Sequence, residues 1–178
     1  MGRVTTDERR EPLRWEDVVT RLVAERGDAL TRYAALVSGR PGDAADLVQD
    51  ALVRTFGRLR NGHSIASAEA YVRRAILNAS IDAGRRSSRW RRIRHLEAVP
   101  ESQPAPDGDV HAQVDLQAEL ARLTPRERAC LVLRYYDDLT VAAIAETLGL
   151  SEGAVKRYLS DGLGRLRLRL HNERTDRG

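Results

Sequence analysis

The stretch LGLSEGAVKRYL, residues 148–159, ends one helical pattern and starts another within three residues. Gly149 suits the left-handed residue that closes a helix, and Ser151 suits the N-cap of the next helix. Upstream, Thr140 can cap a helix over residues 141–148, and downstream an apolar stripe continues at helical spacing. Two helices joined by so tight a turn predict a helix-turn-helix.

The second helix of this motif keeps a polar face opposite its apolar stripe. In a helix-turn-helix, residues near the start of the second helix reach base edges in the major groove of DNA. Lys156 and Arg157 can bind guanine or phosphate, and the Ser160 hydroxyl can form a hydrogen bond with either group. A helical hairpin with a merely solvated basic face is the alternative, but the caps, the turn and the cations all agree with DNA binding.

Asp161 on the same face has two interpretations. Its carboxylate can accept a hydrogen bond from a cytosine amino group. It can instead pair with Arg157 or Arg165, four residues away on either side. Because helical spacing brings both arginines within reach, the sequence favours the pairing interpretation.

Charge is distributed in blocks along the 178 residues, although the net charge is only +4. Six arginines and no acid lie between residues 85 and 94, whereas six acids and no Lys or Arg lie between residues 97 and 119. Two basic blocks around an acidic one favour two polyanion-binding surfaces, although solvated helix faces give the same pattern.

The stretch PESQPAPDGDV, residues 100–110, holds three prolines and one glycine and predicts a flexible linker. We therefore predict that the chain is divided into a domain over residues 1–95, an acidic linker over 96–115, a helix-turn-helix domain over 116–172 and a disordered tail over 173–178.

Apolar residues recur at helical spacing on both sides of the linker, and no strand-like alternation occurs. The predicted helices cover residues 13–24, 28–37, 43–59, 68–86, 114–123 and 126–136, followed by the two helices of the helix-turn-helix. Asp43 is a candidate N-cap, and Thr124 with Pro125 supplies an N-cap and a first-turn proline. The predicted fold class is all-α: two small helical domains joined by a flexible acidic linker, the C-terminal one a helix-turn-helix.

Two helices of the N-terminal half carry polar faces of opposite character. Asp46, Gln49 and Asp50 lie opposite the apolar stripe of the 43–59 helix, where they suit a basic protein partner, although an ordinary solvated face is an open alternative. Arg74 and Asn78 share a face of the next helix with further arginines, and cations there suit a phosphate backbone.

Three stretches in register resemble the extracytoplasmic-function (ECF) sigma factors of bacterial RNA polymerase. They are DAADLVQDALVRTF (43–56), AYVRRAILNASIDAGRR (70–86) and LTPRERACLVLRYYDDLTVAAIAETLGLSEGAVKRYLSDGLGRLR (123–167). The second stretch contains the Arg-x-x-x-Asn-x-x-x-Asp motif of the family. Its Tyr-Val-Arg-Arg sequence most resembles an actinobacterial branch of the family. The resemblance covers about residues 28–94 and 116–170.

This resemblance implies a transcription initiation factor without catalysis of its own. Its partners would be core RNA polymerase, through the clamp helices of the largest subunit and the flap region, promoter DNA and an anti-sigma protein. The implied polymerase-binding residues are Asp46, Gln49, Asp50 and Arg54. The implied contacts to the minus-ten element are Asn61, His63, Ser64, Arg74, Asn78, Arg85 and Arg86. The implied contacts to the minus-thirty-five element are Ser151, Glu152, Gly153, Lys156, Arg157, Ser160 and Asp161.

The chain departs from the usual family pattern at five positions. The family commonly has Glu at the positions of Ala45 and Ala143, Trp near Tyr71, Thr at Ala154 and Arg at Asp161. The last difference replaces a cation with an acid on the face that the resemblance implies contacts DNA. We therefore expect the preference at the minus-thirty-five element to differ from the family norm.

Other functional classes have little support in the sequence. A helix-turn-helix repressor or activator with a helical sensor domain is the main alternative. An enzyme is disfavoured because the four histidines are scattered and no carboxylates have metal-ligand spacing, so no cofactor or metal is expected. Cys130 lies in an apolar run and suggests an inert thiol. Neither a membrane span nor a signal peptide is apparent, and we expect a cytoplasmic protein.

Overall fold

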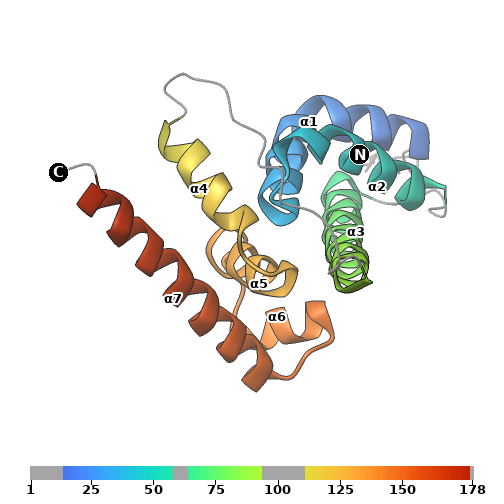
Figure 1. Ribbon diagram of the computed structural model, residues 1–178. Helices are drawn as coiled ribbons and strands as arrows, with labels where there is room; N and C mark the ends of the chain where they lie inside the picture. The colour runs from blue at the N-terminus through green and yellow to red at the C-terminus, as the bar shows by residue number, and fades with distance from the viewer. Residues whose placement is uncertain (1–13, 58–63, 94–110, 177–178) are drawn as a thin grey trace, which may run out of the picture.

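The computed structural model describes residues 14–57, 64–93 and 111–176, and all regular structure in these ranges is helical. The elements are α1 (Trp15–Ser38), a short 3-10 helix η1 (Pro41–Asp43), α2 (Ala44–Phe56), α3 (Ile65–Ile93), α4 (His111–Ala121), α5 (Pro125–Tyr135), α6 (Val141–Leu148) and α7 (Glu152–Asp176). Helices α1 to α3 form one group and α4 to α7 the other, with α5 next to the first group (Figure 1). The predicted all-α class is confirmed.

The helix-turn-helix forms from the local signals that predict it. Thr140 Oγ1 accepts a hydrogen bond from the Ala143 N–H at 3.2 Å, and Ser151 Oγ accepts one from the Ala154 N–H at 3.2 Å. Gly149 takes the left-handed conformation with φ of 61°, which glycine adopts without steric cost. Both N-caps and the turn between α6 and α7 are therefore confirmed.

The start of α5 is fixed by a reciprocal pair of hydrogen bonds. Thr124 Oγ1 accepts from the Glu127 N–H, and the Thr124 N–H donates to Glu127 Oε2 at 3.0 Å. Pro125 occupies the first turn, as predicted. Glu127 Oε2 also accepts from Arg165 Nη1 at 2.9 Å, so the cap of α5 is tied to the middle of α7.

Several predicted boundaries are wrong. The separate helices expected over 13–24 and 28–37 are one helix, α1, which passes through Gly27. An interior glycine costs a helix about 1 kcal/mol, but Leu22 and Leu30 on either side are fully buried, and their packing outweighs this cost. Residues 111–115, assigned to the linker, are helical in α4, and α7 continues to Asp176. Neither extension contains a proline or a glycine that would end the helix.

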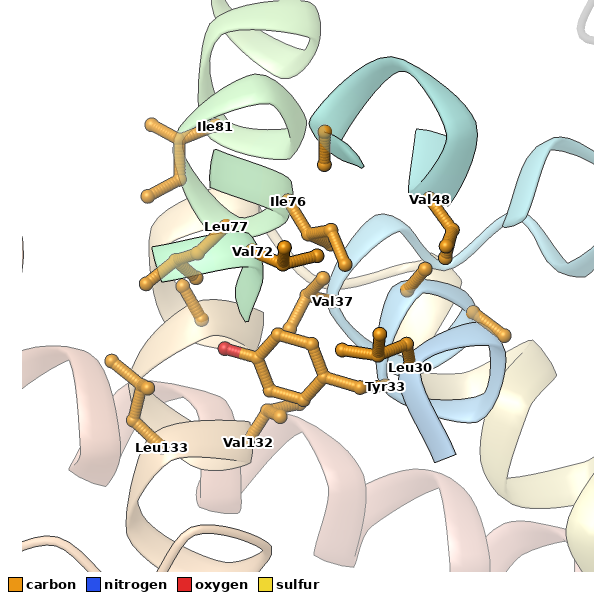
Figure 2. Packing of buried hydrophobic residues seen from close by; sticks show 14 of the residues in the cluster. Leu30, Tyr33, Val37, Val48, Val72, Ile76, Leu77, Ile81, Val132 and Leu133 are labelled. Atoms are coloured by element: carbon orange, nitrogen blue, oxygen red, sulfur yellow. The ribbon is translucent and has the colours of Figure 1, made fainter. Parts of the chain in front are cut away.

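One continuous core joins the two groups of helices. Figure 2 shows Tyr33 and Val37 of α1 converging with residues of α3 and with Val132 and Leu133 of α5. Every residue of α5 from Glu127 to Leu133 is buried, because α5 is covered by α1 and α3 on one side and by α7 on another. The sequence analysis predicts two domains separated by a flexible linker, and this division does not indicate that α5 lies in the centre of the molecule.

None of the described helices is both long and apolar enough to cross a membrane.

Candidate nucleic-acid and partner interfaces

Helix α2 separates its apolar and acidic residues as predicted. Its inward side chains, among them Val48, Ala51 and Phe56, are buried in the core. The opposite side is exposed and carries the predicted polymerase-binding residues Asp46, Gln49, Asp50 and Arg54. Asp43 occupies the N-cap position, but its side chain makes no capping hydrogen bond and instead lies 3.7 Å from Arg40. The result is an acidic surface available to a basic partner.

Helix α3 carries an exposed basic face. Arg74, Asn78, Arg85 and Arg86 are all exposed. Arg85 lies 3.9 Å from Asp82, and both side chains are more than half exposed, so this pair does little to neutralise the face. A row of arginines beside an amide can bind phosphates and the edge of an unpaired base.

The loop before α3 is only partly described. The predicted contact residues Asn61 and His63 lie outside the described residues. Ser64 is exposed, and its Oγ accepts a hydrogen bond from the Ser67 N–H at 3.2 Å, in the manner of an N-cap for α3. Ser64 therefore has a structural role at the helix start, which the sequence analysis does not anticipate.

The face of α7 that is predicted to contact DNA is open to solvent along its first three turns. All seven predicted residues are exposed, namely Ser151, Glu152, Gly153, Lys156, Arg157, Ser160 and Asp161. On the opposite side Val155 is fully buried against Ile144 and Ala145 of α6. The Arg157 guanidinium lies 5.7 Å from the centre of the Tyr158 ring, which orients it at the edge of the face.

The expected pairing of Asp161 is not present. Arg165 instead donates to Glu127 at 2.9 Å, because Glu127 is a buried carboxylate at the cap of α5 and holds the guanidinium there. Arg157 lies on Tyr158 and makes no ion pair with Asp161 in the described part of the chain. Asp161 is thus an exposed carboxylate, free to meet a base edge.

A cleft of about 880 Å³ separates the acidic face of α2 from the C-terminal helices. Asp46 and Asp50 line one side, and Leu123, Pro125 and Arg128 line the other. Ser80 of α3 also lines this cleft; its hydroxyl is buried and has no hydrogen-bond partner among the described residues.

Arg128 and Arg73 join the two sides of the molecule, and the sequence analysis identifies neither. Arg128 is buried and donates to the carbonyl oxygens of Val37, Leu120 and Ala121 at 2.9, 3.0 and 3.3 Å. Burial, with a smaller effect of the Arg40 charge, lowers the pKa of Arg128 to about 10. The only hint in the sequence is a cation directly before an uninterrupted apolar run.

Arg73 of α3 forms an ion pair with Asp137 after α5. Burial raises the pKa of Asp137, and the attraction of Arg73 only partly offsets this. The Arg73 guanidinium also lies 4.8 Å from the centre of the Tyr33 ring and 5.7 Å from that of Tyr136. Burial likewise raises the pKa of Tyr33. This cluster joins α1, α3 and the end of α5.

Within the described ranges, no three His, Cys, Asp or Glu side chains come together in a way that could hold a metal ion. Cys130 is fully buried, and burial raises the pKa of its thiol to about 11. A thiol in such surroundings is an inert core residue, as the sequence analysis suggests.

An exposed acidic helix, a basic helix and a helix-turn-helix together define a DNA-binding protein with a protein partner, and comparison with known proteins is consistent with this class. The sigma-70 region 2 family model matches residues 22–91, and the sigma-70 region 4 model matches residues 120–168. The RNA polymerase sigma-E factor of Streptomyces avermitilis is 37% identical over 161 residues, covering 86% of each chain. The ECF RNA polymerase sigma factor SigL of Mycobacterium tuberculosis is 34% identical over 156 residues, covering 84% of this chain and 86% of that one.

A solved structure of similar fold is that of the sigma factor RpoE in complex with the anti-sigma factor NepR from Bartonella quintana. It matches with a TM-score of 0.61 at 21% identity and covers 86% of this chain and 96% of that chain.

The chain belongs to the ECF sigma factors of bacterial RNA polymerase. It is a transcription initiation factor, and its partners are core RNA polymerase and promoter DNA. The actinobacterial relatives agree with the branch indicated by the stretch from Tyr71 to Arg74.

Proposed function

We propose that this sigma factor binds core RNA polymerase through the acidic face of α2, holds the melted minus-ten element on α3 and reads the minus-thirty-five element with α7. The supporting observation is that each of these helices has one buried side and one exposed side. Each buries its apolar side in the shared core, while the described residues assigned to polymerase or DNA are exposed. A unit over residues 1–95 would perform the first two tasks and a unit over 116–172 the third. The chain would do so without catalysis of its own.

The polymerase contact is tested by reversing the charge of Asp46 and Asp50 together. Because both carboxylates are exposed on the same face, reversal should weaken the complex with core polymerase by about 2 kcal/mol or more. The matched control is the same reversal at Glu25 and Asp28, which are exposed on α1. Equal core binding by the two double variants, measured by competition for labelled core enzyme, would refute the assignment.

The DNA contacts are tested with promoter variants in transcription by reconstituted holoenzyme. Arg157→Ala should reduce discrimination at individual base pairs of the minus-thirty-five element, by about 1–3 kcal/mol at a contacted base. Arg74→Ala should weaken transcription from all minus-thirty-five variants alike, because its proposed contact is to the melted strand. A loss confined to the minus-thirty-five element in Arg74→Ala would contradict the division of roles.

We further propose that an anti-sigma protein regulates the chain, as NepR binds the RpoE of similar fold. Control by expression level is the alternative. Purification of the tagged chain from its own cells separates the two, because full activity on constitutive expression with no co-purifying protein would favour expression control. Since the chain acts on polymerase at promoter DNA, its proposed location is the bacterial cytoplasm. The comparisons give no support to a repressor or activator with a sensor domain.

A further inference from the structure

Arg165 of α7 has two carboxylates within its reach. Asp161 lies one turn before it on the same helix, and Glu127 lies on the neighbouring helix α5. The Arg165 Nη1 donates to Glu127 Oε2 at 2.9 Å, and Arg165 forms no ion pair with Asp161 among the described residues. The side chain of Glu127 is only 4% exposed, whereas that of Arg165 is 51% exposed. The choice of partner decides whether the exposed carboxylate of Asp161 is neutralised.

Glu127 holds Arg165 because its own carboxylate is buried and fixed in place. Glu127 Oε2 also accepts from the Thr124 N–H at 3.0 Å, and the Glu127 N–H donates to Thr124 Oγ1 at 3.3 Å. A buried carboxylate without a cation is far more costly than an exposed one, because water cannot solvate it. The competition between the two carboxylates for Arg165 therefore favours Glu127 over Asp161.

The two helices come close together at Gly162, the residue directly after Asp161. A Cβ atom at this position would lie 2.9 Å from Leu131 Cδ1 and 3.4 Å from Glu127 Cβ. Gly162 is buried, whereas Asp161 is exposed. One turn of α7 thus meets α5 on one side and presents Asp161 to solvent on another. A residue of α5 can therefore control the charge of this turn without contacting DNA itself.

Arg157, the other arginine one turn from Asp161, is also held apart from it. Its guanidinium lies 5.7 Å from the centre of the Tyr158 ring and makes no ion pair in the described part of the chain. A free carboxylate in the major groove can accept a hydrogen bond from the amino group of cytosine or adenine. A carboxylate paired with an arginine has fewer free acceptor positions, so it discriminates less between bases.

We propose that Glu127 is a positioning residue for promoter specificity. It holds Arg165 away from Asp161, and the free carboxylate of Asp161 then reads an amino-bearing base of the minus-thirty-five element. This inference rests on the proposed function, in which α7 contacts that element. Glu127 is buried and touches no base, so its whole effect passes through Arg165 to Asp161.

The test is Glu127→Gln in the full chain. Glutamine can occupy the same place in the capping box of α5, but it has no charge with which to hold Arg165. The released guanidinium is then free to pair with Asp161, and an exposed pair at this helical spacing shifts an equilibrium by about twofold. The preference at one base pair of the minus-thirty-five element should therefore fall by about twofold. Two promoters that differ at this pair are transcribed in the same reaction by reconstituted holoenzyme, so the ratio of transcripts gives the preference directly.

Removal of the released cation should restore the preference. Glu127→Gln combined with Arg165→Gln leaves Asp161 without a partner, so this double variant should match the wild-type chain, as should Arg165→Gln alone. A role of Glu127 in the stability of α5 would give no such rescue. Arg167→Gln is the matched control, because Arg167 is exposed on α7 but lies six residues from Asp161. Asp161→Ala gives the full size of the preference, which should fall by about fivefold or more.

Three results would overturn the proposal. The first is an unchanged preference in Glu127→Gln when Asp161→Ala lowers it. The second is a loss in Glu127→Gln that persists when Arg165→Gln is added. The third is an equal response of all promoter variants to Asp161→Ala, since Asp161 would then read no base. Failure of the proposed function itself would appear differently, because the wild-type holoenzyme would then give no promoter-dependent transcription.

Discussion

Arg128 is a buried cation that contacts α1 and α4 from α5, and Arg128→Met tests how much it stabilises the fold. The guanidinium donates to three backbone carbonyl oxygens, those of Val37, Leu120 and Ala121. Methionine keeps an apolar stem but leaves the Val37 and Ala121 carbonyl oxygens without this donor, whereas the Leu120 carbonyl oxygen still accepts from the Leu123 N–H at 3.1 Å. A buried acceptor left unsatisfied costs about 1–3 kcal/mol, so two of them cost about 4 kcal/mol.

Part of this cost is offset because the buried charge is itself unfavourable. A pKa lowered from 12.5 to about 10 corresponds to about 3 kcal/mol. Relief of that penalty leaves a net loss of about 1 kcal/mol, or about 2–4 °C in Tm for a chain of this size. The stability of Arg128→Lys should lie between that of the wild-type chain and that of Arg128→Met. One ammonium group cannot reproduce the planar guanidinium, whose donors reach the ends of both α1 and α4.

The assay is thermal and urea unfolding of the full chain followed by circular dichroism. Arg126→Met is the matched control, since Arg126 lies on the same helix and its buried Nη1 has no hydrogen-bond partner among the described residues. Arg126→Met should be neutral or slightly stabilising. If Arg128→Met were as stable as Arg126→Met to within about 0.5 kcal/mol, the hydrogen bonds to the three carbonyls would not be the source of stability.

Four further outcomes are expected. Ser80→Ala should leave stability unchanged or raise it by up to about 1 kcal/mol in urea unfolding, because the buried hydroxyl has no partner among the described residues. Since burial raises the pKa of Asp137 above its usual 3.8, the folded chain holds this proton more tightly than the unfolded chain. Its contribution to stability should therefore fall as pH rises through the range just above 3.8, and unfolding of Asp137→Asn across that range should lack this component. Cys130, with a pKa of about 11, should react with a thiol reagent at neutral pH only after denaturation. Asp161→Ala should relax preference at one base pair of the minus-thirty-five element by about 1–3 kcal/mol, whereas a uniform shift across a promoter panel would exclude base reading.

The sequence predicts those parts of the fold that depend on neighbouring residues. The caps at Thr124, Thr140 and Ser151 and the turn at Gly149 each involve groups within a few positions of one another. Side-chain chemistry at such short range leaves a direct signal in the sequence. The exposed faces of α2, α3 and α7 are predicted equally well, because helical spacing alone decides which residues lie opposite an apolar stripe.

The contacts between the two halves could not be predicted in this way. Arg73 and Asp137 are 64 positions apart, and Arg128 and Val37 are 91 apart. No local pattern distinguishes these arginines from the many exposed ones. The same limit explains the error at Asp161, where local spacing brings Arg165 within reach but a buried carboxylate from α5 binds it instead.

The division of α7 into a buried side and a reading side affects how promoter specificity can diverge. Val155 fills the core, while the residues proposed to touch bases project into solvent; of these, Ser151 also caps the start of α7. Substitutions on the reading side beyond Ser151 therefore carry little folding cost. Duplicated genes could acquire new promoter preferences in a few mutational steps without passing through unstable intermediates. The same freedom makes this surface suitable for building sigma factors that act on separate synthetic promoters within one cell.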